Sequence, residues 1–133
     1  MKNIIETIES LPKMLHLTPA SEKQIKKAEK SLKLKFSSEY NNYLTKFGAI
    51  SAEGIELTGI TDAAYLSVVT LTKEERKLNQ FITKNMYVVQ DTAIDGIIIW
   101  QDENGLIYLT QYDSKPKQIA TSLVDYITNY LKK

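Results

Sequence analysis

The sequence predicts an α+β fold, in which helices pack on a mostly antiparallel sheet meander. Two patterns predict this class. Apolar residues recur at helical spacing in the first 50 residues and again near the end of the chain, whereas the region between them holds short strand-like runs separated by turn residues. With 133 residues the chain has the length of one ordinary domain. We therefore expect a single domain over residues 1–133.

Two helices are expected in the first 33 residues. The first spans residues 3–15 and is ended or bent by Pro12; its apolar stripe is Ile4, Ile5, Ile8, Leu11 and Leu15. The second begins after Ser21, because Ser21 and Gln24 have the spacing of a capping box. Its inward positions are Ile25, Ala28 and Leu32, and its opposite face carries Lys23, Lys26, Lys27, Lys30 and Lys33.

A third helix follows Ser37 and ends at Gly48, where a residue with positive φ is favoured. Its apolar positions are i, i+3, i+4 and i+7, namely Tyr40, Tyr43, Leu44 and Phe47. One stripe at this spacing is typical of a buried helix face. We therefore expect these aromatic rings in the core, since base-stacking aromatics need exposure and basic neighbours.

The middle of the chain is expected to form strands around one inserted helix. The predicted strands are residues 54–57, 65–71, 86–90, 96–101 and 106–111. Thr72-Lys73-Glu74-Glu75 has the pattern of a capping box and predicts a helix to about Phe81. Ile97 to Trp100 is apolar at every position and predicts a central strand, which Asn104-Gly105 joins to the next in a hairpin.

The chain is expected to close with an amphipathic helix. Thr121 or Ser122 is its candidate cap, and its apolar positions are Leu123, Val124, Ile127, Tyr130 and Leu131. Lys132-Lys133 would be favourable at its C-terminus.

The overall charge of +1 conceals an acidic middle segment. Residues 1–50 carry +4 and residues 114–133 carry +3, whereas residues 51–113 hold ten acidic and four basic side chains, or −6. If the loops of this segment share one side of the sheet, they form an acidic patch that favours a basic partner. The candidate partner-binding residues are Glu53, Glu56, Asp62, Asp91, Asp95, Asp102 and Glu103. Candidate aromatic anchors are Tyr65, Tyr108 and Tyr112, with packing in the sheet as the alternative.

The composition disfavours catalysis. The chain has no cysteine, and its one histidine, His16, has no metal-ligand partner at a fixed spacing. The five glycines form no phosphate loop, and Asp91, Asp95 and Asp102 lack the spacing of a calcium loop. We therefore expect no catalytic residue, no metal and no cofactor.

The sequence also predicts the cellular location of the protein and leaves two further binding alternatives open. No signal peptide is recognised, and the longest apolar run, Ile97 to Trp100, is too short to span a bilayer, so a cytoplasmic protein without membrane contact is expected. The lysine face of the second helix makes nucleic acid or a small ligand the weaker binding alternative. An exposed edge of the meander leaves homodimer formation open.

Several motifs resemble the SUKH superfamily. They are Ala20-Ser21-Glu22-x-x-Ile25-x-x-x-Glu29-x-x-Leu32, then Phe36-Ser37-x-x-Tyr40-x-x-Tyr43-Leu44, Gly48 and Glu53-Gly54-Ile55-Glu56-Leu57-x-Gly59, together with the meander and Ser122-Leu123-x-x-Tyr126-Ile127. The similarity runs from about residue 18 to the end. The chain departs from the family pattern at Ser37, where relatives have proline, at Lys33, where they have glycine, and at Phe47, where they have asparagine.

The resemblance implies a binding function. Bacterial SUKH proteins are commonly immunity proteins that silence a secreted polymorphic toxin, often a nuclease, whereas fungal relatives regulate cell-wall synthesis and signalling through protein contacts. The expected function is therefore that of an immunity protein for a cognate toxin domain, with a regulatory protein-binding scaffold as the alternative.

Overall fold

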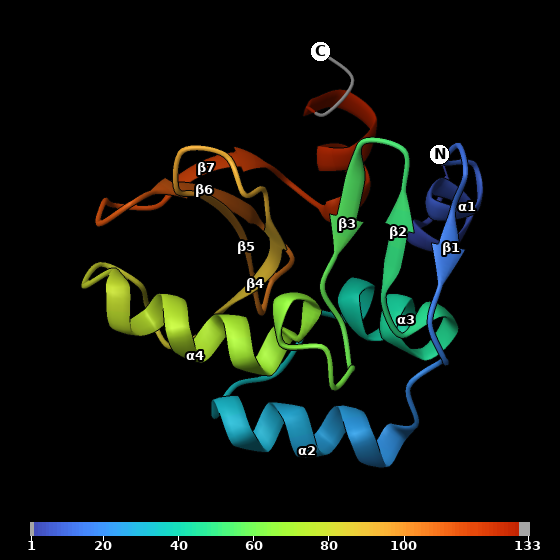
Figure 1. Cartoon of the computed structure of the whole chain (residues 1–133), viewed down its shortest axis with the longest axis horizontal. Coiled ribbons are helices and arrows are strands. Elements are labelled where there is room, and N and C mark those ends of the chain that lie inside the picture. Colours follow the sequence, from blue (N-terminus) through green and yellow to red (C-terminus); the bar gives the residue numbers. More distant parts are fainter. Residues whose placement is uncertain (1, 131–133) are drawn as a thin grey trace.

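The structure, a computed structural model, describes residues 2–130 and contains two antiparallel sheets with helices packed around them (Figure 1). The strands are β1 (Leu15–His16), β2 (Ile50–Ala52), β3 (Ile55–Leu57), β4 (Met86–Asp91), β5 (Ile97–Asp102), β6 (Ile107–Gln111) and β7 (Lys117–Ala120). The first sheet has the order β1-β2-β3, and the second is the meander β4-β5-β6-β7. The predicted α+β class is confirmed, and β5 is a central strand as expected.

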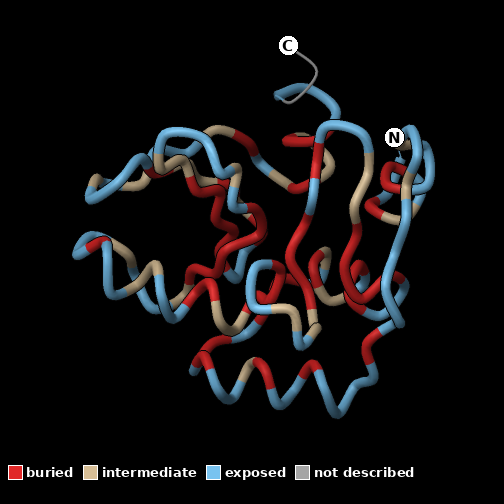
Figure 2. Tube along the Cα trace, viewed as in Figure 1, coloured by how far each residue is buried: buried red, intermediate tan, exposed pale blue. Residues whose placement is uncertain are grey.

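The helices precede, separate and follow these strands. They are α1 (Ile4–Glu9), α2 (Glu22–Leu32), α3 (Ser38–Phe47), α4 (Val68–Leu78) and α5 (Leu123–Asp125), with a 3₁₀ turn η1 (Ala64–Leu66) and a π-helical segment η2 (Tyr126–Tyr130). Buried residues line the inner sides of the helices and strands, and the loops and outer helix faces are exposed (Figure 2).

The aromatic stripe of α3 is the centre of the core. Tyr40, Tyr43, Leu44 and Phe47 are all buried, Ser37 caps the helix, and Gly48 has φ of +74°. The buried hydroxyl groups have partners: Tyr43 donates to the Thr58 carbonyl oxygen at 2.7 Å, and Tyr40 bonds the Thr58 hydroxyl at 2.8 Å. The stripe is therefore core, as predicted, and its polar atoms are satisfied.

Thr58 also joins the two sheets. Its amide donates to the Val89 carbonyl at 2.9 Å, and its hydroxyl donates to the Val88 carbonyl at 2.8 Å. Because β3 and β4 meet at this residue, the loop that follows β3 is held against the second sheet.

Two close backbone contacts fix that loop. A Cβ atom on Gly59 would lie 1.6 Å from the Gly48 carbonyl oxygen, so only glycine fits there. The Ile60 amide donates to the same oxygen at 3.1 Å. The loop that carries Asp62 is therefore set by the end of α3.

The helix boundaries were predicted correctly at Ser21 and Ser122 and wrongly in α4. Ser21 and Gln24 form the expected reciprocal capping box, and Ser122 accepts a hydrogen bond from Asp125 N at 2.9 Å. Residues 65–71 are not a strand, because η1 and the first turn of α4 occupy them. The cap of α4 is Ser67, and Thr72 lies inside the helix, where its buried hydroxyl accepts a hydrogen bond from Val88 N.

The two ends of the fold also depart from the predicted pattern. The first helix ends at Glu9, and Leu15 is 73% exposed in β1 instead of belonging to the helical stripe. The terminal helix continues as η2, in which Ile127 is buried and Tyr130 is partly exposed. The predicted positions Leu131 and Lys132-Lys133 lie outside the described residues.

The β5–β6 hairpin forms where Asn104-Gly105 predicted it. Of these two residues only Gly105 has positive φ, at +93°. Gly105 N donates to Asp102 O at 2.9 Å, and Asp102 N donates to Leu106 O at 3.0 Å. The turn is thus the wider kind that ends in a glycine, not a two-residue turn with two positive φ angles.

Candidate functional site

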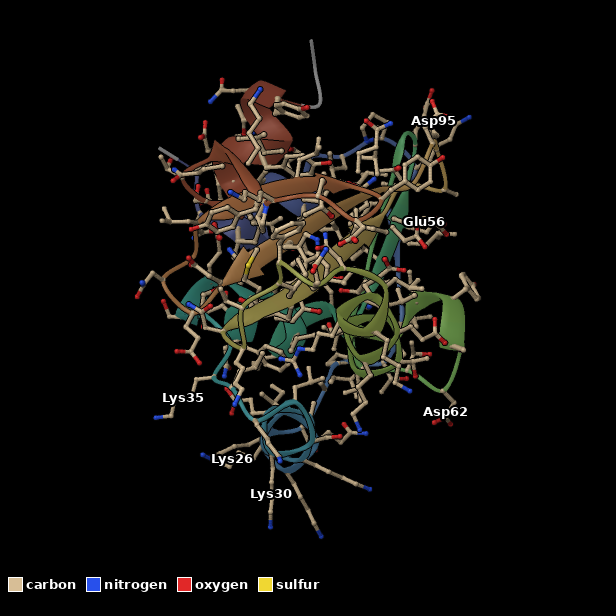
Figure 3. The ribbon with its side chains drawn as sticks, turned by 90° about the vertical axis from the view of Figure 1, so that its left-hand side faces the viewer. Lys26, Lys30, Lys35, Glu56, Asp62 and Asp95 are labelled. Carbon is tan, nitrogen blue, oxygen red and sulfur yellow. The ribbon has the colours of Figure 1, made fainter. Side chains whose placement is uncertain are left out.

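Most of the predicted acidic residues are exposed and belong to three segments, and Glu56, Asp62 and Asp95, one from each, lie on one side of the molecule (Figure 3). Glu53 and Glu56 belong to the β2–β3 hairpin, Asp62 follows β3, Asp91 ends β4, and Asp95 lies in the β4–β5 connection. Figure 3 shows Glu56, Asp62 and Asp95 along one side, whereas Lys26, Lys30 and Lys35 extend from the bottom and the opposite side. We call Glu53, Glu56, Asp62, Asp91 and Asp95 the acidic face.

Asp102 does not belong to this face. It is buried, and its Oδ1 atom accepts hydrogen bonds from Asn104 N at 2.9 Å and Leu106 N at 3.0 Å. Its Oδ2 atom accepts a hydrogen bond from the Tyr108 hydroxyl at 2.9 Å. Desolvation raises the pKa of Tyr108, and Asp102 raises it further. The Asp102 carboxylate shapes the hairpin turn, and the candidate anchor Tyr108 is committed to it.

Glu103 is exposed but lies beside the lysines. Its Oε2 atom accepts a hydrogen bond from Lys35 N at 2.9 Å. Together with Lys26, Lys30, Lys33 and Lys35 it lines an open hollow of about 660 Å³ at the end of α2. Glu103 is therefore part of a mixed, mainly basic surface.

The acidic face contains a cleft that sequence reasoning missed. Its volume is about 590 Å³, and it lies between α4, the β4–β5 connection and the residues that follow β6. The lining residues are Glu75, Leu78, Asp91, Ala93, Asp95, Gly96, Ile98, Tyr112 and Asp113. We call this hollow the α4 cleft. Only Asp91, Asp95 and Tyr112 had been singled out, because nothing in the sequence brings Glu75 and Asp113 next to them.

The loops around the α4 cleft have an unusual backbone. Ala93, Asp95 and Tyr112 have φ between 49° and 57°, a region that L-residues rarely adopt. The Tyr112 ring packs on Gly96, where an added Cβ would lie 2.4 Å from a ring atom. The Asp91 side chain accepts a hydrogen bond from Ala93 N at 2.9 Å and closes the turn. These contacts give the cleft a defined wall.

Burial within the α4 cleft perturbs Glu75. Desolvation raises the pKa of this carboxyl, and the negative charges of Asp91 and Glu74 raise it further. A raised pKa means that the charged form of Glu75 is less favourable in the folded protein than it is in water. A cation in the cleft would relieve this cost.

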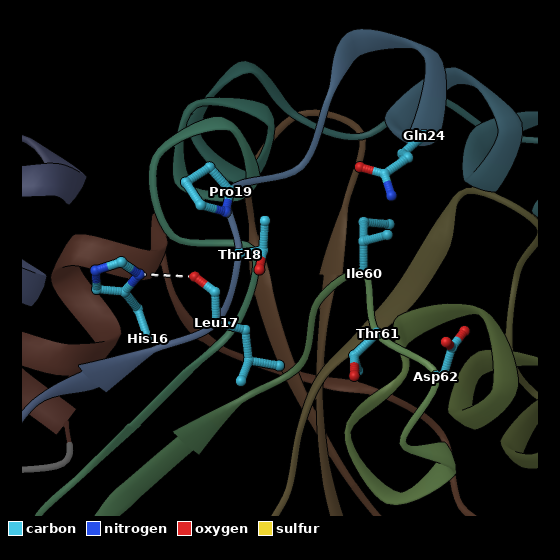
Figure 4. Close-up of a pocket in the computed structure, with 8 residues that line it drawn as sticks. All are labelled: His16, Leu17, Thr18, Pro19, Gln24, Ile60, Thr61 and Asp62. Carbon is cyan, nitrogen blue, oxygen red and sulfur yellow. Dashed lines mark hydrogen bonds between the residues drawn. The ribbon is translucent and has the colours of Figure 1, made fainter.

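A second hollow of about 850 Å³ lies next to Asp62 (Figure 4). His16 and Asp62 stand on opposite sides of it, and the His16 Nδ1 atom donates to the Leu17 carbonyl oxygen at 2.7 Å. Histidine and carboxylate are thus not paired. The remaining lining residues are Leu17, Thr18, Pro19, Gln24, Ile60 and Thr61.

The described residues show neither a membrane span nor a metal cluster. No helix within residues 2–130 is both long and apolar enough to cross a bilayer. Across the same residues, no group of three or more histidine or carboxylate side chains is placed to hold a metal ion.

The comparison with protein families agrees with the motifs. The family model SUKH_5, described as SMI1-KNR4 cell-wall, matches residues 1–132. No curated protein matches the chain. Because the family match covers the chain almost from end to end, the chain belongs to the SUKH_5 family of the SUKH superfamily.

Proposed function

We propose that this protein is an immunity protein, which binds the toxin domain of a cognate bacterial polymorphic toxin and neutralises it. Membership of the SUKH superfamily supports a protein-binding role. The observation that favours a basic toxin domain is the acidic face, where carboxylates from three segments are exposed on one side while the lysines of α2 point elsewhere (Figure 3).

The proposed mechanism is occlusion by a charged surface. A nuclease domain is usually basic on its substrate-binding surface, because that surface holds phosphate groups. An acidic surface would speed the encounter of the two proteins and then occupy the phosphate-binding site. On this proposal the protein acts in the cytoplasm by stoichiometric binding, without catalysis or cofactor, and nucleic acid is not its ligand.

The second candidate is a regulatory scaffold that binds a cellular protein. The family description, which refers to the cell wall, favours this alternative. A scaffold would bind its partner without abolishing an enzymatic activity. Self-association through the sheet edge stays a prediction, and the outer strand β7 carries Lys117, which discourages edge pairing.

The identity of the partner is the test of the proposed function. Tagged protein is exposed to lysate of its source cells, and the captured protein is identified and assayed with and without the tagged protein. A basic nuclease domain, held one to one and inactive in the complex, is the expected result. Capture of a wall-synthesis or signalling protein that keeps its activity would replace the immunity proposal with the scaffold.

Charge reversal tests the acidic face. Glu53→Lys, Glu56→Lys and Asp62→Lys are combined in one variant, and Lys23→Glu, Lys26→Glu and Lys30→Glu form the matched control on α2. Because steering acts on association, the acidic-face variant should associate with the captured domain at least about tenfold more slowly at low salt. Stopped-flow measurements at rising salt would contradict the proposal if both variants retained the unmodified rate and salt dependence.

A further inference from the structure

The α4 cleft exposes apolar side chains that a folded protein normally covers. Leu78 is 68% exposed, Tyr112 is 69% exposed, and the adjacent Ile94 is 62% exposed. Ile98 lies buried at the floor. Large apolar side chains gathered around one groove mark an interaction site more often than singly scattered ones.

The groove arises from the inward stripe of α4. Val68, Leu71 and Thr72 are buried against the second sheet, and Glu75 and Leu78 follow at helical spacing. At Glu75 the apolar stripe is interrupted by a carboxylate, and beyond it the helix leaves Leu78 uncovered. The inner side of α4 thus changes from core to groove within one turn.

The charge of the groove determines which kind of partner can bind in it. Four carboxylates line the groove, those of Glu75, Asp91, Asp95 and Asp113, and among the described residues no lysine or arginine lines it. The Asp113 carboxylate already accepts hydrogen bonds from Gln80 N and Gln80 Nε2, both at 3.1 Å, so Glu75, Asp91 and Asp95 are the principal groups for a cation.

Lys73 and Lys77 of α4 stand two positions from Glu75, and helix positions two apart do not share a face. Arg76, the third basic residue of the helix, donates to Leu32 O at 3.1 Å and Lys84 O at 3.0 Å and does not line the groove. The basic side chains of the helix therefore leave the groove acidic.

The walls are fixed to each other by a buried side chain. Asn79 Nδ2 donates to Tyr112 O at 3.2 Å and to Ser114 O at 2.8 Å, and Asn79 Oδ1 accepts a hydrogen bond from Phe81 N at 2.9 Å. The end of α4 is thus tied to the segment that presents Tyr112. A groove that exists before binding spares its ligand part of the ordering cost.

We propose that the α4 cleft is a docking groove for a basic segment of a partner protein, in which an arginine side chain enters between the carboxylates and a neighbouring apolar residue covers Leu78 and Tyr112. Arginine fits because its planar cation pairs with carboxylates while it packs on an aromatic ring. This inference rests on the proposed function in one respect, that the ligand is a protein. It adds the chemistry of the contact and its place.

A short fluorescent peptide in which arginine and leucine alternate is the probe. The matched control peptide carries citrulline, an uncharged analogue, in place of each arginine. Binding is followed by fluorescence anisotropy at physiological salt, and amide chemical shifts locate the site. We expect the arginine peptide to bind at least about tenfold more tightly than the citrulline peptide, as befits charge-assisted hydrogen bonds, and to shift the Gly96 and Tyr112 amides.

Variants distinguish binding in the groove from general electrostatic attraction to the acidic face. Asp91→Asn with Asp95→Asn removes two charges at the groove and keeps the turn, since asparagine retains the acceptor for Ala93 N and tolerates positive φ. Glu53→Gln with Glu56→Gln removes two charges elsewhere on the acidic face. The first pair should weaken binding of the arginine peptide about tenfold and the second less than twofold. Leu78→Ser should weaken it as well, with an unchanged thermal transition.

The groove proposal would be wrong if both pairs of substitutions weakened peptide binding equally, or if the arginine peptide bound no more tightly than the citrulline peptide. The groove proposal and the proposed function can fail independently of each other. Peptide binding at the groove by a protein that inhibits no toxin supports the groove and removes the immunity role. If the Asp91→Asn, Asp95→Asn variant still inhibits the toxin fully, the immunity role is supported and the groove is not the site of toxin binding.

Discussion

Glu39 has a structural role that its position in the first turn of α3 does not reveal. Its Oε1 atom accepts hydrogen bonds from Leu123 N at 2.7 Å and Gln101 Nε2 at 2.8 Å, and its Oε2 atom accepts one from Val124 N at 3.1 Å. The carboxylate therefore caps α5 from another helix, which is favourable because a helix N-terminus attracts negative charge. One side chain connects α3, β5 and the terminal helix.

Glu39→Ala is predicted to lower the free energy of unfolding by about 2 kcal/mol, because three donors lose a charged acceptor. Urea denaturation followed by circular dichroism measures the change. Glu9→Ala, at the exposed end of α1, is the control and should change stability by less than about 0.5 kcal/mol. Equal midpoints for the two variants would show that solvent replaces the Glu39 cap.

At the scale of elements, the helices that the sequence predicts correctly are those whose caps and apolar spacing are local signals. The stripes of α2 and α3 were predicted because caps and spacing agree, and the capping box at Ser21 formed as expected. Residues 65–71, predicted as a strand, contain the β-branched run Val68-Val69-Thr70, which has high strand propensity. The burial of Val68, Leu71 and Thr72 against the meander overrode that propensity, and Thr72 bonds Val88 instead of capping a helix.

The short edge strands and the α4 cleft could not be predicted from local sequence signals, because they too depend on tertiary contacts. β1 has two residues, and β7 has exposed Lys117 and Gln118 at its start, so neither shows an apolar period. The sequence itself places negative charge at Asp91 and Asp95, and their role in partner binding stays a prediction. The sequence could not reveal that Asp102 is buried in its own turn or that Glu103 lies with the lysines, since both outcomes depend on the folded hairpin.

Asn79 supplies the buried part of the connection between α4 and the β6–β7 segment, to which Gln80 and Asp113 add two exposed hydrogen bonds. Asn79→Ala is predicted to destabilise the protein by about 2 kcal/mol, because its buried amide bridges two carbonyl oxygens and one backbone amide. Hydrogen exchange should accelerate at Tyr112 and Ser114 more than in β5. Asn129→Ala, in an exposed part of η2, is the comparison. Uniform acceleration across all strands would instead indicate a global loss of stability.

At the scale of the whole molecule, buried tyrosines make stability depend on alkaline pH. Desolvation raises the pKa of Tyr40, Tyr43 and Tyr87, and all three are almost fully buried. Their phenols stay protonated in the folded chain at a pH where the unfolded chain has begun to lose the same protons. The unfolded state therefore binds fewer protons there, and stability falls as pH rises.

The prediction is a loss of stability that begins near pH 10, the ordinary pKa of tyrosine, with a slope of up to about 1.4 kcal/mol per pH unit for each of the three. Urea midpoints measured at increasing pH give the slope. Tyr87→Phe should reduce it, whereas a Tyr65→Phe control at an exposed position should not alter it. A flat profile above pH 10 would mean that these rings are accessible to hydroxide in the native state.

The cap that Glu39 provides has a consequence for synthesis on the ribosome. Its two backbone donors, Leu123 and Val124, lie 84 and 85 residues downstream, so this part of the core stays unfinished while most of the chain is being made. Until those residues emerge, α3 has its hydrophobic stripe, but the Glu39 carboxylate has no terminal helix to cap. We therefore expect the nascent chain to leave apolar surface of this unfinished core open to chaperones and proteases until its last residues are made.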